Sequence, residues 1–300
     1  MRQQSLAFLK ELVQTPSPSG FEHQAQQLIR EELSTIADEV STDVHGNVTG
    51  ALNPGAEMRV MLAGHVDEIG LMVKHITDGG YLYVTQIGGV DPVVAVAQRV
   101  TVHGPKGAVP GVIGRVAIHL TDKEDRGKPM KIHELWVDIG AKNKKDAEKV
   151  IRIGDPSTFD AGPVHLRNGL LAARAFDDRM GAFAVAETLR KLKGKKLRVA
   201  VYGVSTVQEE VGTRGAETAA DAVQPDVALV LDVGIATDTP GFKPEDKLKF
   251  TTNSRPKGMN KETYAAAKND VLDLCLTLGC RFLSFVIHHD ICLLYTSDAA

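Results

Sequence analysis

Apolar residues near the start of the chain recur at helical spacing. Leu6, Leu9 and Val13 lie three or four positions apart, a spacing that puts side chains on one face of an α-helix. A second stretch with the same spacing runs over residues 22–37. Prolines and a glycine at 15–20 separate the two stretches. The pattern predicts two amphipathic helices joined by an irregular segment.

The pattern then changes to short apolar runs bounded by turn residues. Residues 59–63 form a buried strand that ends in the sequence GHVDEIG, and residues 69–159 contain short β-branched runs separated by Gly and Pro, with one short helix at 144–151. Such spacing is typical of a small β-barrel. Beyond residue 162 strands alternate with helices again. We expect strands over 41–44, 48–52, 169–175, 197–205 and 226–231, and helices over 178–192 and 214–222.

The simplest architecture is an α/β fold, with a central mixed sheet and flanking helices, interrupted by an inserted small β-barrel. We assign residues 1–68 and 163–300 to a discontinuous α/β domain, and residues 69–162 to the barrel. A length of 300 residues fits two domains at about 150 residues each. All-β insertions are usually packing or assembly modules, so we expect the barrel to mediate oligomerisation. We expect its histidines to be structural or on the surface.

Composition excludes several classes of protein. An apolar fraction of 43% supports a real core. The net charge of -3 argues against a general nucleic-acid binder. No apolar run approaches the length of a membrane span, and the N-terminus lacks the continuous apolar stretch of a signal peptide. We therefore expect no membrane partner and a cytoplasmic location.

Acidic and imidazole side chains gather where strands are expected to end. The clusters are His65 with Asp67, Asp177 with Asp178, Glu209 with Glu210, and Asp232. In open α/β sheets, binding sites form outside the carboxyl ends of the strands. The four clusters are therefore predicted to converge there.

A metal site is the interpretation that the combination favours. Carboxylates at close range cannot all stay ionised unless a cation neutralises them. Histidine with several carboxylates suits zinc, cobalt or manganese, and is enough for two ions. Each cluster alone has a structural alternative: Asp178 as a helix N-cap, Glu209 and Glu210 as a solvated pair, and His65 as a hydrogen-bonded structural residue.

The motifs AGHVDEIG, AFDDRMG, QEEVGTRGA and LDVG, with VDIGAK between them, resemble the M42 family of metallo-aminopeptidases. Members are also called glutamyl aminopeptidases or endoglucanases. The resemblance covers about residues 1–247. It implies a zinc peptidase-like α/β domain with an inserted barrel and two divalent ions, zinc or cobalt. It also implies a homo-oligomer, the tetrahedral dodecamer of the family.

The resemblance also implies roles for individual residues. The expected metal ligands are His65, Glu210, Asp232 and Asp177, with Asp177 bridging both ions. Glu209 is the expected general base, which takes a proton from a metal-bridging water. Asp67 is expected to orient His65 from behind.

The segment after about residue 249 departs from the family pattern. A Gly-rich stretch and a later histidine ligand motif are not found, and the sequence around His288 and His289 does not match that motif. All three cysteines lie here: Cys275, Cys280 and Cys292. An odd, clustered count does not indicate a disulfide framework. We expect a divergent, frame-disrupted tail that lacks the last metal ligand.

The function expected is a two-metal aminopeptidase that hydrolyses N-terminal residues from short peptides. One alternative is another two-metal amidohydrolase, such as a deacylase of N-acyl amino acids. Another is a truncated member that is catalytically inactive because its last ligand is missing.

Overall fold

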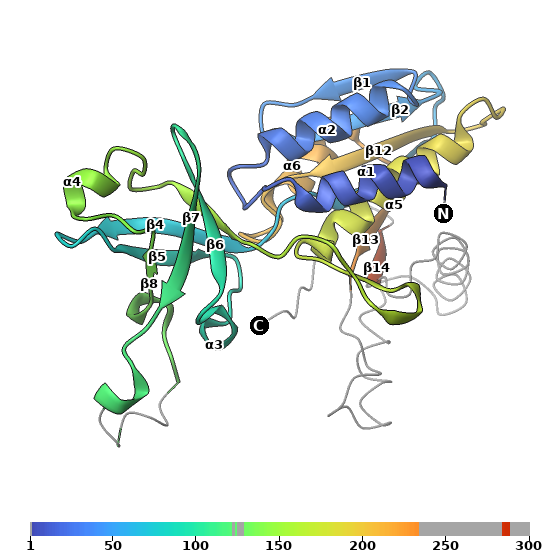
Figure 1. Cartoon of the computed structure of the whole chain (residues 1–300). Helices are drawn as coiled ribbons and strands as arrows, with labels where there is room; N and C mark the ends of the chain where they lie inside the picture. The colour runs from blue at the N-terminus through green and yellow to red at the C-terminus, as the bar shows by residue number, and fades with distance from the viewer. Residues whose placement is uncertain (1, 122–123, 125–128, 234–283, 289–300) are drawn as a thin grey trace. The chain divides into compact units, whose positions relative to one another are not determined.

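The computed structural model describes residues 2–121, 124, 129–233 and 284–288 (Figure 1). The chain divides into two compact units. Residues 68–162 form one unit, and the described residues before and after them form the other. The two units are described separately below.

A mixed six-stranded sheet is the centre of the first unit. Its strand order is β1 (Glu39–Thr42), β2 (Val48–Leu52), β12 (Ala200–Thr206), β3 (Arg59–His65), β13 (Val227–Asp232) and β14 (Ser284–His288). β12 and β13 run parallel to β3 on its two sides. β2 and β14 are antiparallel to their neighbours. The predicted mixed sheet with flanking helices is confirmed.

Helices cover both faces of this sheet. The helices are α1 (Gln3–Gln14), α2 (His23–Ser34), α5 (Phe176–Leu192) and α6 (Arg214–Val223). Leu62 of β3 packs in the core shared with α1, α2 and α5, whereas its neighbours Met61 and Ala63 pack against α6. This alternation follows from the two-residue period of a strand. The buried face of α1 matches the apolar spacing in the sequence, and that of α2 does so with Gln26 added, whereas α5 is buried all round from Gly181 to Leu189.

The second unit is a closed six-stranded barrel. Its order is β4 (Gly70–Ile76), β5 (Leu82–Ile87), β8 (Trp136–Asp138), β7 (Gly107–Gly114), β6 (Arg99–Gly104) and β9 (Pro156–Phe159). Short helices α3 (Pro92–Ala95) and α4 (Lys144–Ala147), and 3-10 turns at Ile118–Leu120 and Ile132–Glu134, lie between the strands. Leu71, Val84 and Val137 are among the buried residues that fill it. The predicted small barrel is confirmed.

Two predicted elements are much shorter in the structure. The strand expected at 169–175 is only β11 (Leu171–Ala172), which pairs with β10 (Val164–His165) outside the main sheet, across a 3-10 turn at Arg167–Gly169. The turn brings the chain back on itself, so the apolar run pairs locally. The helix expected at 144–151 ends at Ala147, because the next residues form tight turns.

No helix in the described part of the chain is long and apolar enough to cross a membrane.

Candidate metal centre

The candidate site lies at the carboxyl ends of three neighbouring parallel strands. His65 is the last residue of β3 and is opposite Thr206, the last residue of β12. Asp232 ends β13 on the other side of β3. Glu209 and Glu210 follow β12 by a few residues. The sheet therefore brings these clusters to one edge, as expected for this class of fold.

Asp177 and Asp178 reach the site from a helix, which corrects the expectation that they follow a strand of the sheet. They lie in the first turn of α5, where the backbone of both is non-helical. Gly64 lets the next turn of α5 approach β3, because a Cβ there would lie 2.5 Å from the backbone nitrogen of Ala182. Close contact between glycine and helix thus places both carboxylates beside His65.

His65 is buried, with 4% of its surface exposed. Its Nδ1 lies 3.1 Å from the backbone oxygen of Asp67 and 3.3 Å from Oδ1 of the same residue. Two acceptors at Nδ1 keep a proton on that nitrogen, which turns Nε2 toward Asp177 Oδ1 at 3.4 Å. Burial opposes the charged ring, but Asp177 and Asp67 outweigh it and raise the pKa of His65 well above its usual value.

Asp67 is fully buried, and its carboxylate has several donors. The backbone N–H of Glu209 donates to Oδ1 at 3.0 Å, and that of Glu210 donates to Oδ2 at 3.1 Å. The hydroxyl of Ser19 donates to Oδ2 at 2.6 Å. Burial alone would raise the pKa of Asp67, but contacts with His65, Ser19 and Glu209 lower it. The residue is therefore an ionised anchor under the site.

The adjacent acids Asp177 and Asp178 have opposite surroundings. The Asp177 side chain is 56% exposed, whereas Asp178 is fully buried. Asp178 accepts hydrogen bonds from the backbone N–H of His65 at 3.3 Å and of Gly181 at 3.1 Å. The second bond is the helix N-cap contact weighed for Asp178 from the sequence. Burial, with repulsion from Asp232 and Asp177, raises the pKa of Asp178 well above its usual value despite His65.

Glu209 and Glu210 face the same cluster from the loop after β12. Oε2 of Glu209 lies 3.7 Å from Nε2 of His65. Burial raises the pKa of Glu210 to about 8; His65 opposes the rise, and the charges of Asp177, Glu209 and Asp67 add to it. A divalent cation bound among such crowded carboxylates would offset their repulsion and favour their ionised forms.

Two groups of ligand atoms could hold an ion in the described part of the chain. His65, Asp177 and Glu210 form one, and His65, Asp178 and Asp232 form the other; within each group the atoms lie within 4.8 Å of one another. One imidazole with carboxylates is a donor set that suits zinc or cobalt. The residues present therefore fit a metal. No barrel histidine belongs to either group.

Three residues that contact the chain segments of the site were not predicted from the sequence. Ser19 lies in the segment 15–20 that the prolines marked only as irregular, and Glu22 stands at the start of the helix expected over 22–37, one residue before α2 begins. Arg179 is fully buried and donates to the backbone oxygens of Leu12 and Val66 and to the hydroxyl of Ser17. Only the motif AFDDRMG drew attention to Arg179, and nothing in the spacing marked the two others.

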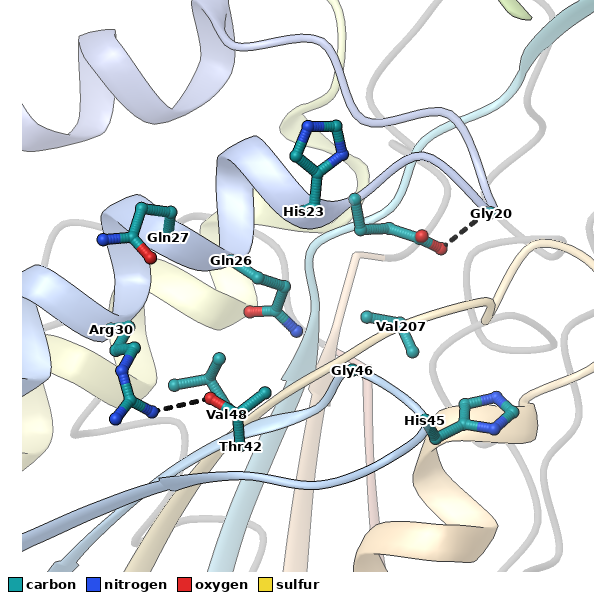
Figure 2. Close-up of a pocket in the computed structure, with 11 residues that line it drawn as sticks. Gly20, His23, Gln26, Gln27, Arg30, Thr42, His45, Gly46, Val48 and Val207 are labelled. Atoms are coloured by element: carbon teal, nitrogen blue, oxygen red, sulfur yellow. Dashed lines mark hydrogen bonds between the residues drawn. The ribbon is translucent and has the colours of Figure 1, made fainter.

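A separate pocket of about 280 Å³ lies beside this site, between α2 and the turn that joins β1 to β2 (Figure 2). Gly20, Glu22 and Gln26 line it together with Val207, which directly precedes the loop of Glu209. The carboxylate of Glu22 accepts from the backbone N–H of Gly20 at 2.8 Å.

The expectations for the tail concern residues that lie largely outside those described. The three cysteines, His289 and residues 234–283 are all outside them. His288 is the last residue of β14, opposite Ala228 of β13.

Comparisons with known proteins agree with the geometry. The family model described as M42 glutamyl aminopeptidase matches residues 46–272, past residue 247 where the resemblance was expected to end. Lysyl aminopeptidase from Pyrococcus furiosus is 36% identical over 245 residues, which are 81% of this chain and 68% of that protein.

Solved structures give the same result. The TET aminopeptidase from the marine sediment archaeon Thaumarchaeota archaeon SCGC AB-539-E09 matches with a TM-score of 0.78 and 40% identity, over 80% of this chain and 68% of that one. The TET1 peptidase of Pyrococcus horikoshii matches with a TM-score of 0.71 and 32% identity. That peptidase is described as able to assemble into a tetrahedron or a large octahedral shell. The match covers 80% of this chain and 72% of that one. Sequence, fold and site together show that the chain belongs to the M42 glutamyl aminopeptidase family, and so to the metal-dependent aminopeptidases.

Proposed function

We propose that this aminopeptidase uses two divalent ions to remove N-terminal residues from short peptides. The observation that supports this most is the meeting of His65, Asp177 and Glu210, with Glu209 beside them. The buried imidazole and the carboxylates would then all serve to bind metal ions. Each acid alone has a simpler structural explanation, but together they form a cation site.

The proposed ligands are His65, Asp177, Glu210 and Asp232. Asp177 is the better candidate than Asp178 for the carboxylate shared by two ions, because its side chain is half-exposed and faces Nε2 of His65. Both oxygens of Asp178 already accept backbone N–H groups. Asp178 would therefore hold the start of α5 in place. Zinc or cobalt suits these donors.

Glu209 is the proposed general base. When bound, the ions would polarise the scissile carbonyl and lower the pKa of water. The carboxylate of Glu209 would take the proton from the attacking water and return it to the leaving amine. Asp67 would keep the proton of His65 on Nδ1, so that Nε2 stays available as a ligand.

Homo-oligomerisation through the barrel is part of the proposal. Exposed apolar side chains on the barrel unit, among them Val93, Val94 and Leu120, are consistent with a covered surface. The TET1 relative assembles into closed shells, and the proposed assembly here is the tetrahedral dodecamer. Mass photometry of the full chain tests it: a dodecamer mass supports the proposal, and a monomer contradicts it.

The experiment that tests the reaction measures amino-acid release from a peptide panel, with N-acyl amino acids as competing substrates. We expect free N-terminal residues from the peptides and no release from the acylated compounds. Metal analysis should give near two ions per chain, and a chelator should abolish activity. Activity that survives metal removal, or a preference for acylated substrates, would overturn the proposal.

A further inference from the structure

Three successive backbone N–H groups in the loop after β12 bind to two carboxylates. Gln208 donates to Oε1 of Glu22 at 3.2 Å, Glu209 to Oδ1 of Asp67 at 3.0 Å, and Glu210 to Oδ2 of Asp67 at 3.1 Å. Successive N–H groups that point to one side form a concave anion site in many proteins. Here the anions are the side chains of Glu22 and Asp67. These carboxylates hold the loop in place through its backbone N–H groups.

The loop needs such support. Gln208 has φ of 55°, in the left-handed region that residues with a side chain seldom adopt. This conformation is less favourable than the right-handed form. It persists where surrounding contacts determine it. Glu22 and Asp67 supply those contacts from either end of the loop.

Ser19 holds one of the two carboxylates. Its hydroxyl donates to Oδ2 of Asp67 at 2.6 Å, the same oxygen that accepts the N–H of Glu210. Asp67 is fully buried, so each hydrogen bond to it has no replacement from solvent. The hydroxyl thus restricts rotation of the carboxylate on which two loop N–H groups depend.

The segment that contains Ser19 is itself well fixed. The hydroxyl of Ser17 donates to the backbone oxygen of Val66 at 2.6 Å and also contacts the buried guanidinium of Arg179. Glu22 at the other end binds Gly20 and Gln208. Residues 17–22, which we call the serine strap, therefore contact both chain segments that contain site residues, 65–67 and 208–210. Gly20 and His23 line one pocket together with Val207 (Figure 2).

We propose that Ser19 is a positioning residue: its hydroxyl fixes the carboxylate of Asp67, and through it the backbone of Glu209 and Glu210. This inference rests on the proposed function only for its effect on turnover. The positioning of the loop follows from the contacts alone.

The test compares Ser19→Ala, Ser19→Thr and wild type as the purified full chain. In Ser19→Ala, amide hydrogen exchange over residues 208–211 should become about 10-fold faster, the loss of one buried hydrogen bond. The kcat should fall about 10-fold, with KM unchanged within about twofold. Ser19→Thr keeps the hydroxyl and should restore both values.

Ser34→Ala is the matched control, because its hydroxyl also donates one hydrogen bond, to the backbone oxygen of Arg30 at 2.7 Å, but at an exposed position outside the site. It should change neither value. Unchanged exchange in Ser19→Ala, or a Ser19→Thr variant no better than Ser19→Ala, would overturn the proposal. If the exchange responds as expected but wild type cleaves no peptide, the positioning role stands and the proposed function fails.

Discussion

Nδ1 of His65 is 3.1 Å from the backbone oxygen of Asp67 and 3.3 Å from its carboxylate oxygen Oδ1. One residue thus holds the imidazole with its backbone and its side chain together. The same carboxylate accepts the N–H groups of Glu209 and Glu210. Asp67 therefore links the ring to the loop of the proposed base, and this link determines what its substitution should do.

Replacing Asp67 with Asn should weaken metal binding about 10- to 100-fold. An amide cannot accept from all of the present donors, since one of its two atoms donates instead. Competition titration of zinc against a chromogenic chelator measures the change. Asp43→Asn is a control outside the site; Asp43 also accepts backbone N–H groups, from His45 to Asn47. Equal zinc affinity in wild type and Asp67→Asn would contradict the role given to Asp67.

Glu209→Gln should lower kcat by at least about 100-fold, the usual contribution of a general base. The amide is nearly isosteric but cannot take a proton from water. Glu209 is not among the proposed ligands, so metal content should stay at the wild-type value. Steady-state kinetics with elemental analysis of the same samples checks both statements. An active Glu209→Gln enzyme would exclude Glu209 as the base.

The stability of the metal-free chain should fall as the pH rises from about 5 to about 8. Burial, opposed by His65 and reinforced by Asp177 and Glu209, raises the pKa of Glu210 to about 8, whereas an unfolded glutamate titrates near 4.5. Between these values the folded chain keeps a proton that the unfolded chain releases. The contribution of Glu210 to the free energy of unfolding is complete below about pH 4.5 and is lost as the pH rises to about 8.

Urea unfolding of the metal-free protein at pH 5, 6.5 and 8 tests this. Glu210→Gln lacks the titrating group, so its free energy of unfolding should decline less over this range. Parallel pH profiles for the two proteins would show that Glu210 titrates normally. The same proton must leave when a metal binds, so zinc affinity should increase with pH in this interval.

Gly64→Ala should destabilise the chain severely, by roughly 3 kcal/mol or more, the upper range for overpacking a core. The new Cβ would lie 2.5 Å from the backbone nitrogen of Ala182, and a backbone atom cannot move aside as a flexible side chain can. Gly55→Ala is the control, because nothing lies within 4 Å of its Cβ position. Urea denaturation of both variants measures the difference. A Gly64→Ala protein as stable as wild type would show that the approach of α5 to β3 is looser than described.

Much of the fold could be predicted because its elements follow simple periods. The four-residue spacing of Leu9 and Val13 marks α1, and the continuous apolar run around Leu62 marks a strand with two buried faces. The segment 169–175 could not be assigned in the same way. Its apolar residues fit a strand, but pairing with Val164–His165 is decided by the turn between them.

The candidate site divides in the same manner. His65, Glu209 and Asp232 could be predicted because they stand at the ends of strands or, for Glu209, a few residues after one. Which of Asp177 and Asp178 is buried could not, since adjacent acids in an irregular turn have no period to distinguish them. Ser19 was missed because a hydroxyl that acts on a distant carboxylate leaves no trace in local spacing.

The parallel pairing of β3 with β12 joins residues 59–65 to residues 200–206, with the whole barrel between them in sequence. During synthesis from the N-terminus, β3 has no neighbour on that side until residue 206 has left the ribosome. The barrel can fold earlier, because all its strands lie within residues 68–162. A growing chain would therefore contain a finished barrel while His65 still lacks Glu209 and Asp232. The peptidase centre would be among the last parts to form, so partly made copies should be unable to cut peptides.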